Sequence, residues 1–325
     1  MKVLFTGGTG VFGKAVLRYL QAQHALNLAR LPDEVVVLAR SPGKFLNQHR
    51  EFSNVPWLRF HKGDIEDPSS LPRLENYTHV LHAAADSTDA THLSPLQRYD
   101  QIVNGTRNLL DFAVSCGAQR FLFISSGAVY GPQPIHFERI PEDWHGIPDP
   151  LDPANAYGIA KRTAEHLCVL YGQVYDLHTV VARGFAFVGQ DLPLDAHFAI
   201  GNFIRDALWC DEITVHGDGT PLRSYLAQED LARWLMKLLL DGKASRAYNV
   251  GSDETISIAD LACRVRDLLA PDKPVRIIGT LESNAVRNRY VPDIDRARQE
   301  LSLDIFTTLN RAIIQTADAA LKRGH

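Results

Sequence analysis

Short apolar runs alternate along the first half of the chain with longer segments in which apolar residues recur every three or four positions. The runs predict buried β-strands, and the longer segments predict helices with one apolar face. Strands are expected at residues 2–6, 34–39, 58–60, 79–82, 121–125 and 179–182, and helices at 11–20, 101–114 and 160–171. Near-continuous apolar strands that alternate with helices indicate a doubly wound parallel sheet, so the predicted fold class is α/β of the Rossmann type.

The pattern changes after about Arg183, where glycine, aspartate and proline become frequent and the strands shorten. Helical spacing returns at 200–209 and 258–269, which predicts a smaller, mostly helical C-terminal lobe. Residues 230–240 and 248–250 predict a last helix and strand that return to the sheet. The expected domains are therefore 1–183 with about 228–251, and about 184–227 with 252–325.

Composition narrows the class of protein. The 325 residues are 45% hydrophobic and 22% charged, with a formal net charge of -4, so no basic excess favours a nucleic-acid or membrane partner. The start of the chain lacks a signal-peptide pattern and no run of 18 apolar residues occurs, so we expect a soluble, cytoplasmic protein. The four cysteines lie far apart without a CxxC pair, which is typical of core thiols in a reducing compartment, and no metal site is expected.

A glycine-rich turn separates the first predicted strand from the first helix. Its sequence, Gly7-Gly8-Thr9-Gly10-Val11-Phe12-Gly13, satisfies GxGxxG, a spacing that lets the backbone approach a pyrophosphate at a helix N-terminus. A glycine turn alone is weak evidence, but its place between strand and helix favours dinucleotide binding. The expected contacts are Gly7, Gly10, Val11, Phe12 and Gly13.

The end of the second predicted strand indicates which dinucleotide binds. NAD sites usually place an acidic residue there for the ribose 2′-hydroxyl, whereas this chain has Arg40 and Ser41, with Lys44 close behind. A guanidinium suits a 2′-phosphate, so NADP(H) is the predicted cofactor and NAD(H) the alternative. A solvated surface arginine is the simpler reading of Arg40. Asp64 and Ile65 follow the third strand and are expected near the adenine, although Gly-Asp is also a plain turn.

Candidate catalytic groups follow the fifth predicted strand. Tyr157 and Lys161 are four residues apart and so share one face of a helix, where an ammonium beside a phenol lowers the phenol pKa. Such a tyrosine can exchange a proton with a carbonyl oxygen while a hydride moves at carbon. Ser126 ends the preceding strand and could polarise the same carbonyl, and Asn104 could position the site or bond a neighbouring loop.

In their order and spacing these motifs resemble the extended short-chain dehydrogenases/reductases. The segments are TGGTGVFG (6–13), HAAA (82–85), VNGTRNLL (103–110), ISSGAVYG (124–131) and YGIAK (157–161). GDGTPLRSY (217–225), DLA (230–232), YNVG (248–251) and the pair 289–290 before Asp293 resemble its nucleotide-sugar branch, the NAD-dependent epimerase/dehydratase family. The resemblance covers nearly the whole chain.

The resemblance implies roles for individual residues. The catalytic set is Ser126, Tyr157 and Lys161, and Arg223 contacts the substrate diphosphate unless it pairs with a nearby acid. The remaining implied contacts are Ala83, Ala84, Ala85, Asn104, Tyr157 and Lys161 with the cofactor, and Ser126, Phe185, Asn202 and Arg289 with the nucleotide sugar. It also implies an NADP-binding domain, a nucleotide-sugar-binding lobe, and a homodimer formed through helices 101–114 and 160–171.

Departures from the family pattern select among its reactions. The 4,6-dehydratases carry an Asp-Glu pair after the serine or threonine, and Gly127 and Ala128 stand there. Ala186 replaces the asparagine of the RxFNxxG segment, and Asn202 is a candidate substitute. With Arg40 favouring NADPH, the expected activity is reduction of the 4-keto group of a CDP- or dTDP-linked 4-keto-6-deoxyhexose, in deoxysugar or surface-polysaccharide biosynthesis. A 4-epimerase that retains NAD is the alternative, ahead of a 4,6-dehydratase or a non-catalytic NADP(H)-binding protein.

Overall fold

The computed structural model describes residues 1–26, 28, 30–73, 75–84, 93–196, 198–280 and 288–323. The chain forms two compact units. The first comprises Met1–Gly131, Ile147–Arg183 and Ala232–Tyr248, and the second Pro132–Gly146, Gly184–Leu231 and Asn249–His325. The sequence pattern assigns residues 132–146 to the first lobe, but the structure gives them to the second unit. Ile140 explains this difference, since its amide donates to the Val291 carbonyl at 2.9 Å.

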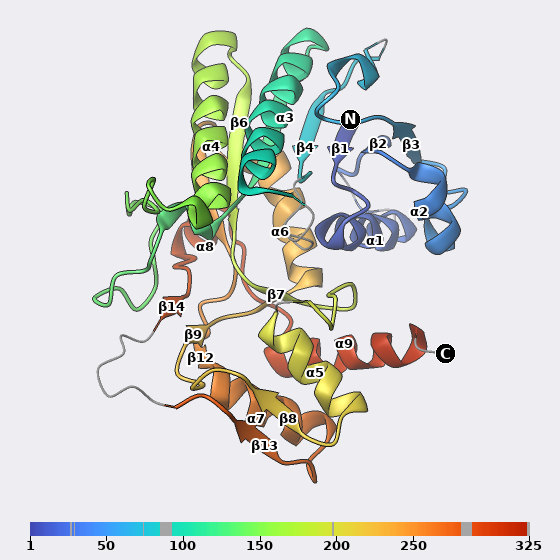
Figure 1. Ribbon diagram of the computed structural model, residues 1–325. Coiled ribbons are helices and arrows are strands. Elements are labelled where there is room, and N and C mark those ends of the chain that lie inside the picture. The colour runs from blue at the N-terminus through green and yellow to red at the C-terminus, as the bar shows by residue number, and fades with distance from the viewer. Residues whose placement is uncertain are drawn as a thin grey trace. The chain divides into compact units, whose positions relative to one another are not determined.

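A seven-stranded sheet dominates the first unit (Figure 1). Its strands are β1 (Lys2–Thr6), β2 (Glu34–Ala39), β3 (Leu58–Lys62), β4 (His79–His82), β5 (Arg120–Ser126), β6 (His178–Gly184) and β11 (Arg246–Val250). The strand order is β11-β6-β5-β4-β1-β2-β3, and β1 runs parallel to both of its neighbours, β2 and β4. The predicted α/β fold with a doubly wound parallel sheet is confirmed. Ligands of such sheets bind where the strand order reverses, which here is beside β1.

The predicted helices of this part of the chain are present and are longer than their apolar patterns, and one short helix, at Pro42–Gln48, was not predicted. The helices are α1 (Val11–Ala25), α2 (Pro42–Gln48), α3 (Pro95–Ser115), α4 (Ala156–Tyr175) and α6 (Gln228–Asp241), with short 3₁₀ turns η1 (Arg50–Phe52), η2 (Pro68–Ser70), η3 (Gly127–Tyr130) and η4 (Pro153–Asn155). Helix α3 begins six residues before its apolar pattern because Ser94 and Gln97 form a capping box. The Ser94 hydroxyl accepts from the Gln97 amide at 3.2 Å, and the Gln97 carboxamide accepts from the Ser94 amide at 2.9 Å.

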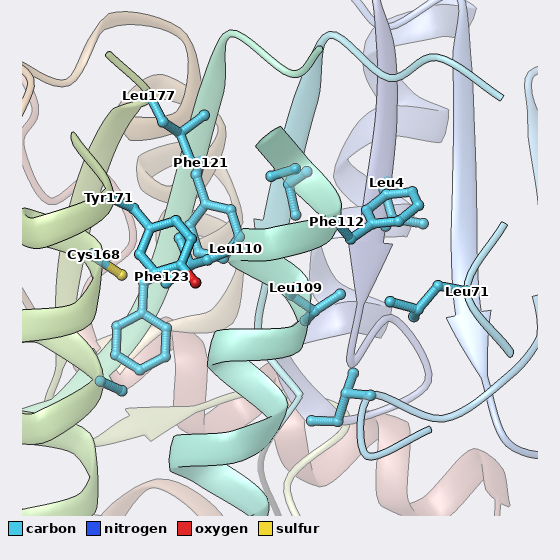
Figure 2. Packing of buried hydrophobic residues seen from close by; sticks show 14 of the residues in the cluster. Leu4, Leu71, Leu109, Leu110, Phe112, Phe121, Phe123, Cys168, Tyr171 and Leu177 are labelled. Carbon is cyan, nitrogen blue, oxygen red and sulfur yellow. The ribbon is translucent and has the colours of Figure 1, made fainter. Parts of the chain in front are cut away.

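The core of the first unit explains why its strands are apolar along their whole length. On one face, strand residues pack against α3 and α4, which stand side by side in Figure 1. Figure 2 shows this cluster, in which Leu4, Phe121 and Phe123 of the strands meet Leu109, Leu110, Phe112, Cys168 and Tyr171 of the two helices. The alternate residues Val3, Phe5 and Leu122 point to the opposite face and are equally buried, so both faces of the sheet are covered.

The second unit contains short strands and four helices among its described residues. The strands are β7 (Phe187–Val188), β8 (Ile213–Val215), β9 (Leu222–Arg223), β10 (Leu226–Ala227), β12 (Ile256–Ser257), β13 (Val275–Ile277) and β14 (Arg289–Tyr290), and the helices are α5 (Ala199–Trp209), α7 (Ile258–Leu269), α8 (Asp295–Leu301) and α9 (Leu309–Arg323). Buried residues of α5, α7 and α9, such as Ile204, Val265 and Ile313, form its core. The predicted mostly helical C-terminal lobe is confirmed.

The glycine turn joins β1 to α1 through backbone contacts that exclude side chains. Gly7 has φ +77°, and a Cβ there would lie 2.5 Å from the Ala83 carbonyl carbon. A Cβ on Gly13 would lie 2.3 Å from both the Gly7 oxygen and the Gly8 Cα. The Gly10 amide donates to the Gly7 carbonyl at 3.0 Å and closes the turn. The glycines at 7 and 13 are therefore required by packing.

Replacing Gly13 with alanine should destabilise the protein. The added methyl meets backbone atoms that cannot move aside, and overpacking of this kind costs about 2 kcal/mol of the free energy of unfolding. Gly43, in helix α2, is the matched control, because a Cβ there meets nothing within 4 Å and alanine favours helix. Urea denaturation of Gly13→Ala and Gly43→Ala measures both effects. Equal stability of the two variants would contradict the prediction.

Candidate functional site

A cavity of about 210 Å³ opens at the carboxyl ends of β1 to β4 in the first unit. Its walls are Gly7, Thr9 and Gly10 of the glycine turn, residues 38–40 at the end of β2, 63–65 after β3, 83–84 after β4, and Gln101 of α3. Seven of the predicted cofactor contacts therefore come together here: Gly7, Gly10, Arg40, Asp64, Ile65, Ala83 and Ala84. The glycine cradle leaves room for a phosphate chain at the start of α1, where the helix dipole favours an anion.

Arg40 lies at the edge of this cavity in a solvent-exposed position. Within the described part of the chain, its guanidinium has neither an ion-pair nor a hydrogen-bond partner. Ser41 and Lys44 are exposed nearby, at the N-cap and in the first turn of α2, and neither lines the cavity. A guanidinium without a protein partner in the described chain, at the edge of this cavity, can bind a phosphate group.

Asp64 and Ile65 are held by local hydrogen bonds. The Asp64 amide donates to the Ser70 hydroxyl at 2.9 Å, and the Ile65 carbonyl accepts from the Asn108 side chain at 2.9 Å. Helix α3 approaches this loop closely, because a Cβ on Gly105 would lie 2.6 Å from the Ile65 side chain. Hydrogen bonds therefore hold the backbone of Asp64 and Ile65 in place at the wall of the cavity.

Other predicted cofactor contacts are placed differently. Val11, Phe12 and Gly13 form the first turn of α1 and do not line the cavity. Asn104 is exposed on α3, and Gln101, one turn earlier on that helix, lines the cavity in its place. The prediction missed Gln101, although the helical spacing of three residues between the two could have suggested it. Ala85 lies outside the described residues.

His82, the first residue of the HAAA segment, is a structural residue. It is buried, with its Nδ1 2.8 Å from the Thr6 hydroxyl and its Nε2 3.1 Å from the Thr106 hydroxyl. The Thr106 hydroxyl donates to the Ile102 carbonyl at 2.6 Å, so Nε2 is the donor to Thr106 and Nδ1 accepts from Thr6. Burial lowers the pKa of His82 to about 3, so the imidazole stays neutral while it ties β1 and β4 to α3.

The three predicted catalytic residues come together in the first unit. Ser126 ends β5, and Tyr157 and Lys161 lie on one face of α4. The Ser126 side chain forms a hydrogen bond with Tyr157, and the Lys161 ammonium lies 5.9 Å from the centre of the Tyr157 ring. Lys161 is 3% exposed and donates to the Ile124 carbonyl at 2.8 Å, which ties α4 to the end of β5.

The structure contradicts the predicted lowering of the tyrosine pKa. Burial raises the pKa of Tyr157 above its ordinary value, and the opposing effects of Ser126 and Arg98 are smaller. Burial also lowers the pKa of Lys161 to about 7, although Glu165 and Cys168 raise it. The reason is that low-dielectric surroundings disfavour both the phenolate and the ammonium.

A buried polar network lies directly behind the three residues. The Glu165 carboxylate, one turn after Lys161 on α4, accepts from the Ser125 hydroxyl at 2.6 Å and from Arg183 of β6 at 2.7 Å. Arg183 also donates to the Tyr130 hydroxyl at 2.8 Å. The network therefore joins α4, β5, β6 and η3, the elements that carry or flank the catalytic set. The prediction missed it.

The predicted substrate residues other than Ser126 lie in the second unit. Strands β9 and β14 pair in parallel with Tyr290 opposite Arg223, and the Phe185 ring lies 4.6 Å from the Tyr290 ring. Arg223 donates to the carbonyls of Leu222 (2.9 Å) and Asn288 (3.2 Å). Burial lowers the pKa of Arg223, and its hydrogen bonds to the described residues go to Leu222 and Asn288 rather than to a carboxylate. An arginine beside two aromatic rings can bind a phosphate and stack a planar base.

Arg289 and Asn202 are also placed in the second unit. Arg289 precedes Tyr290 on β14 and donates to the Phe137 carbonyl at 3.4 Å. Asn202 lies on α5, where its carboxamide oxygen accepts from Arg205 at 3.4 Å. The Ala186 carbonyl accepts from the Leu226 amide at 3.0 Å, so this position has a backbone role between β7 and β10.

The residues that the structure describes contain neither a candidate metal site nor a membrane-spanning helix. In that part of the chain, no group of three or more histidine, cysteine, aspartate or glutamate side chains could hold a metal ion. Nor does any helix there have both the length and the apolar character that crossing a membrane requires.

Comparison with known proteins shows a consistent pattern. Residues 3–251 match the model of the NAD dependent epimerase/dehydratase family. UDP-glucuronic acid decarboxylase 2 of Arabidopsis thaliana is 27% identical over 315 residues, which cover 96% of this chain and 66% of that protein. The low-salt glycan biosynthesis protein Agl12 of Haloferax volcanii is 32% identical over 260 residues, 79% of each chain. The chain thus spans about two thirds of the length of the plant relative.

Solved structures share the fold over the whole chain. A DesIV double mutant, a dTDP-glucose 4,6-dehydratase from Streptomyces venezuelae with NAD bound, has a TM-score of 0.82 at 26% identity and covers 100% of this chain and 98% of its own. UDP-glucuronic acid 4-epimerase from Bacillus cereus, in complex with UDP-glucuronic acid and NAD, has a TM-score of 0.81 at 23% identity and covers 100% of both chains. The likeness to the 4-epimerase, at 23% identity, shows the fold alone.

Glu165→Gln should destabilise the first unit strongly. It leaves the Arg183 guanidinium, whose side chain is 14% exposed, without its carboxylate, and breaking a buried pair in this way costs about 3 kcal/mol. Glu51→Gln, which breaks the more exposed pair with Arg18, is the control and should cost under about 1 kcal/mol. Urea denaturation gives both values. The double change Glu165→Leu with Arg183→Met should recover much of the loss, and a double variant no more stable than Glu165→Gln would contradict this account.

Proposed function

Since this chain belongs to the NAD dependent epimerase/dehydratase family, we propose that it is an NADP(H)-dependent oxidoreductase of nucleotide sugars. The proposed reaction is reduction of the 4-keto group of a nucleotide-linked 4-keto-6-deoxyhexose, a step of deoxysugar or surface-polysaccharide biosynthesis. The observation that carries the proposal is Arg40, a guanidinium without a protein partner in the described chain, at the edge of the cofactor cavity. A net reductase consumes NADPH, whereas an epimerase returns its hydride and needs no such supply.

The first unit supplies the residues that would hold the cofactor. Gly7 and Gly10 would border the pyrophosphate at the start of α1, Arg40 would pair with the 2′-phosphate, and the 63–65 loop would border the adenine. Ser41, Lys44, Val11, Phe12 and Asn104 remain predicted contacts. When bound, NADPH supplies a hydride to the carbonyl carbon of the substrate. Gly10 supports this assignment, because a Cβ there would meet only the Gly7 oxygen, at 3.4 Å, so the glycine leaves open space beside the start of α1.

The catalytic set performs the proton transfer. Tyr157 gives its phenolic proton to the C4 oxygen as that oxygen becomes an alkoxide, and the Ser126 hydroxyl, which lies beside Tyr157, turns its one proton to the same oxygen. Lys161 holds the end of β5 through the Ile124 carbonyl and contributes positive charge beside the phenol. Dehydration would need an acid and a base after Ser126, and neither Gly127 nor Ala128 can supply one.

The second unit would hold the nucleotide sugar. Arg223 would pair with the diphosphate, since it is partly buried and none of its hydrogen bonds to the described residues is to a carboxylate. Phe185 and Tyr290 offer a ring surface for the base. Arg289 and Asn202 remain predicted contacts of the same ligand.

A homodimer through α3 and α4 is part of the proposal. Four side chains of α4 that point away from the core are at least 40% exposed: Val169, Leu170, Val174 and Tyr175. Such a surface on one helix favours contact with a second copy.

Tyr157→Phe should abolish turnover, because the variant lacks the proton donor. The expected loss in kcat is about a hundredfold or more, in line with removal of a general acid. Cofactor binding, measured by fluorescence titration with NADPH, should stay close to wild type because phenylalanine keeps the ring. Near-normal kcat in this variant would refute the role of Tyr157.

Arg40→Gln should shift cofactor preference. Loss of a charged hydrogen bond to the 2′-phosphate should raise the KM for NADPH about tenfold or more, while the KM for NADH changes little. The assay follows cofactor oxidation with CDP- and dTDP-4-keto-6-deoxyglucose. Interconversion of two sugars without net oxidation of either cofactor would replace the reductase with the 4-epimerase.

A further inference from the structure

Strand β14 carries Arg289 and Tyr290, which are proposed to bind the nucleotide sugar, and it is only 2 residues long. The residue that follows, Val291, is buried, and a loop of the same unit bonds both of its backbone polar groups. The Val291 amide donates to the carboxamide oxygen of Gln133 at 2.9 Å, and its carbonyl accepts from the Ile140 amide at 2.9 Å. A strand with so few ladder bonds of its own depends on contacts of this kind for its position.

The Gln133 carboxamide connects this loop to the end of β14. Its nitrogen donates to the Phe137 carbonyl at 3.1 Å and to the Glu138 carbonyl at 3.3 Å, so both of its N–H groups are used while its oxygen accepts from Val291. The Arg289 guanidinium donates to the same Phe137 carbonyl at 3.4 Å. Because that distance is long for a hydrogen bond, the guanidinium is held in place and can still bind an anion. Gln133 and Arg289 therefore share one acceptor.

The loop has anchors that do not involve Gln133, so it can serve as a fixed support. The centre of the Phe137 ring lies 4.4 Å from that of His136 and 5.3 Å from that of Trp144. The buried Asn249 side chain donates to the Ile140 carbonyl at 2.9 Å. These contacts are independent of the side chain at position 133. Loss of the carboxamide should therefore release β14 and leave the loop folded.

We infer that Gln133 is a positioning residue of the nucleotide-sugar site, which fixes Arg289 and Tyr290 without touching the ligand itself. The inference rests on the proposed function of β14 in binding the nucleotide sugar. Tyr290 lies opposite Arg223 in the pair of β9 with β14, and its ring lies 4.6 Å from that of Phe185. A shift of β14 therefore moves the ring surface and the Arg289 guanidinium together, and both contacts with the ligand weaken.

Two variants separate a positioning role from a merely structural one. Gln133→Met keeps the length of the side chain without a polar group, whereas Gln133→Glu keeps the acceptor for the Val291 amide and places a carboxylate near Arg289. Calorimetric titration of the full chain with CDP and with dTDP should give a Kd about fivefold higher for Gln133→Met and about twentyfold higher for Gln133→Glu, because the carboxylate competes with the diphosphate for the guanidinium. The Kd for NADPH and the kcat with the 4-keto sugar should stay close to wild type, because the residues proposed for them lie in the first unit. Gln315→Met, which loses a hydrogen bond to Glu229 of 3.2 Å, is the control and should bind both nucleotides normally.

The order of the two variants is decisive. A purely structural Gln133 would be replaced better by glutamate, which keeps one bond, than by methionine, so a weaker effect of Gln133→Glu would overturn the inference. Unchanged nucleotide binding in Gln133→Met, an equal loss in Gln315→Met, or an equal loss of NADPH binding would overturn it as well. Circular dichroism and thermal unfolding check that each variant is folded, and the glutamate variant serves as a second test if the methionine variant is not.

The binding of a nucleoside diphosphate requires no hydride transfer, so the titration separates this inference from the proposed reaction. If CDP or dTDP binds and responds to position 133 while no 4-keto sugar is reduced, the proposed reaction fails and the positioning role stands. If the wild-type protein binds neither nucleotide, both fail.

Discussion

The buried ion pair between Glu165 and Arg183 is the interaction on which the reaction site depends. It joins α4 to β6, and through Ser125 and Tyr130 it also fixes the end of β5 and the turn after it. Every candidate catalytic side chain of the first unit lies on one of these elements or beside it. A buried pair adds little net stability but is costly to break, so it fixes one arrangement of the site.

The sequence predicted the strands and helices of the first unit well because both faces of its sheet are buried. Apolar runs at 34–39 and 79–82 coincide with β2 and β4. The start of α3 was missed because a capping box, rather than an apolar residue, begins it. Residues 132–146 gave no periodic signal, and their place in the second unit comes from backbone bonds such as that of Ile140.

Site residues could be predicted where the backbone admits only glycine, or where the residue that the family usually has is replaced by another. Only glycine fits at position 7, because a Cβ there would collide with the Ala83 backbone. Arg40 stands where NAD sites usually have an acidic residue. Prediction failed where the answer depended on which face of a helix turns inward, as with Asn104 and Gln101. Spacing showed that Tyr157 and Lys161 are neighbours, but only the depth of burial decides the direction of each pKa.

Burial of Tyr157 and Lys161 together couples their protons. Burial disfavours the phenolate and the ammonium separately, so it raises the pKa of Tyr157 and lowers that of Lys161 to about 7. Negative charge on Tyr157 would favour the protonated form of Lys161, and the two groups then titrate as a pair with shared pKa values. A proton that leaves the tyrosine can therefore be matched by one gained at the lysine, which keeps the net charge of the buried site nearly constant.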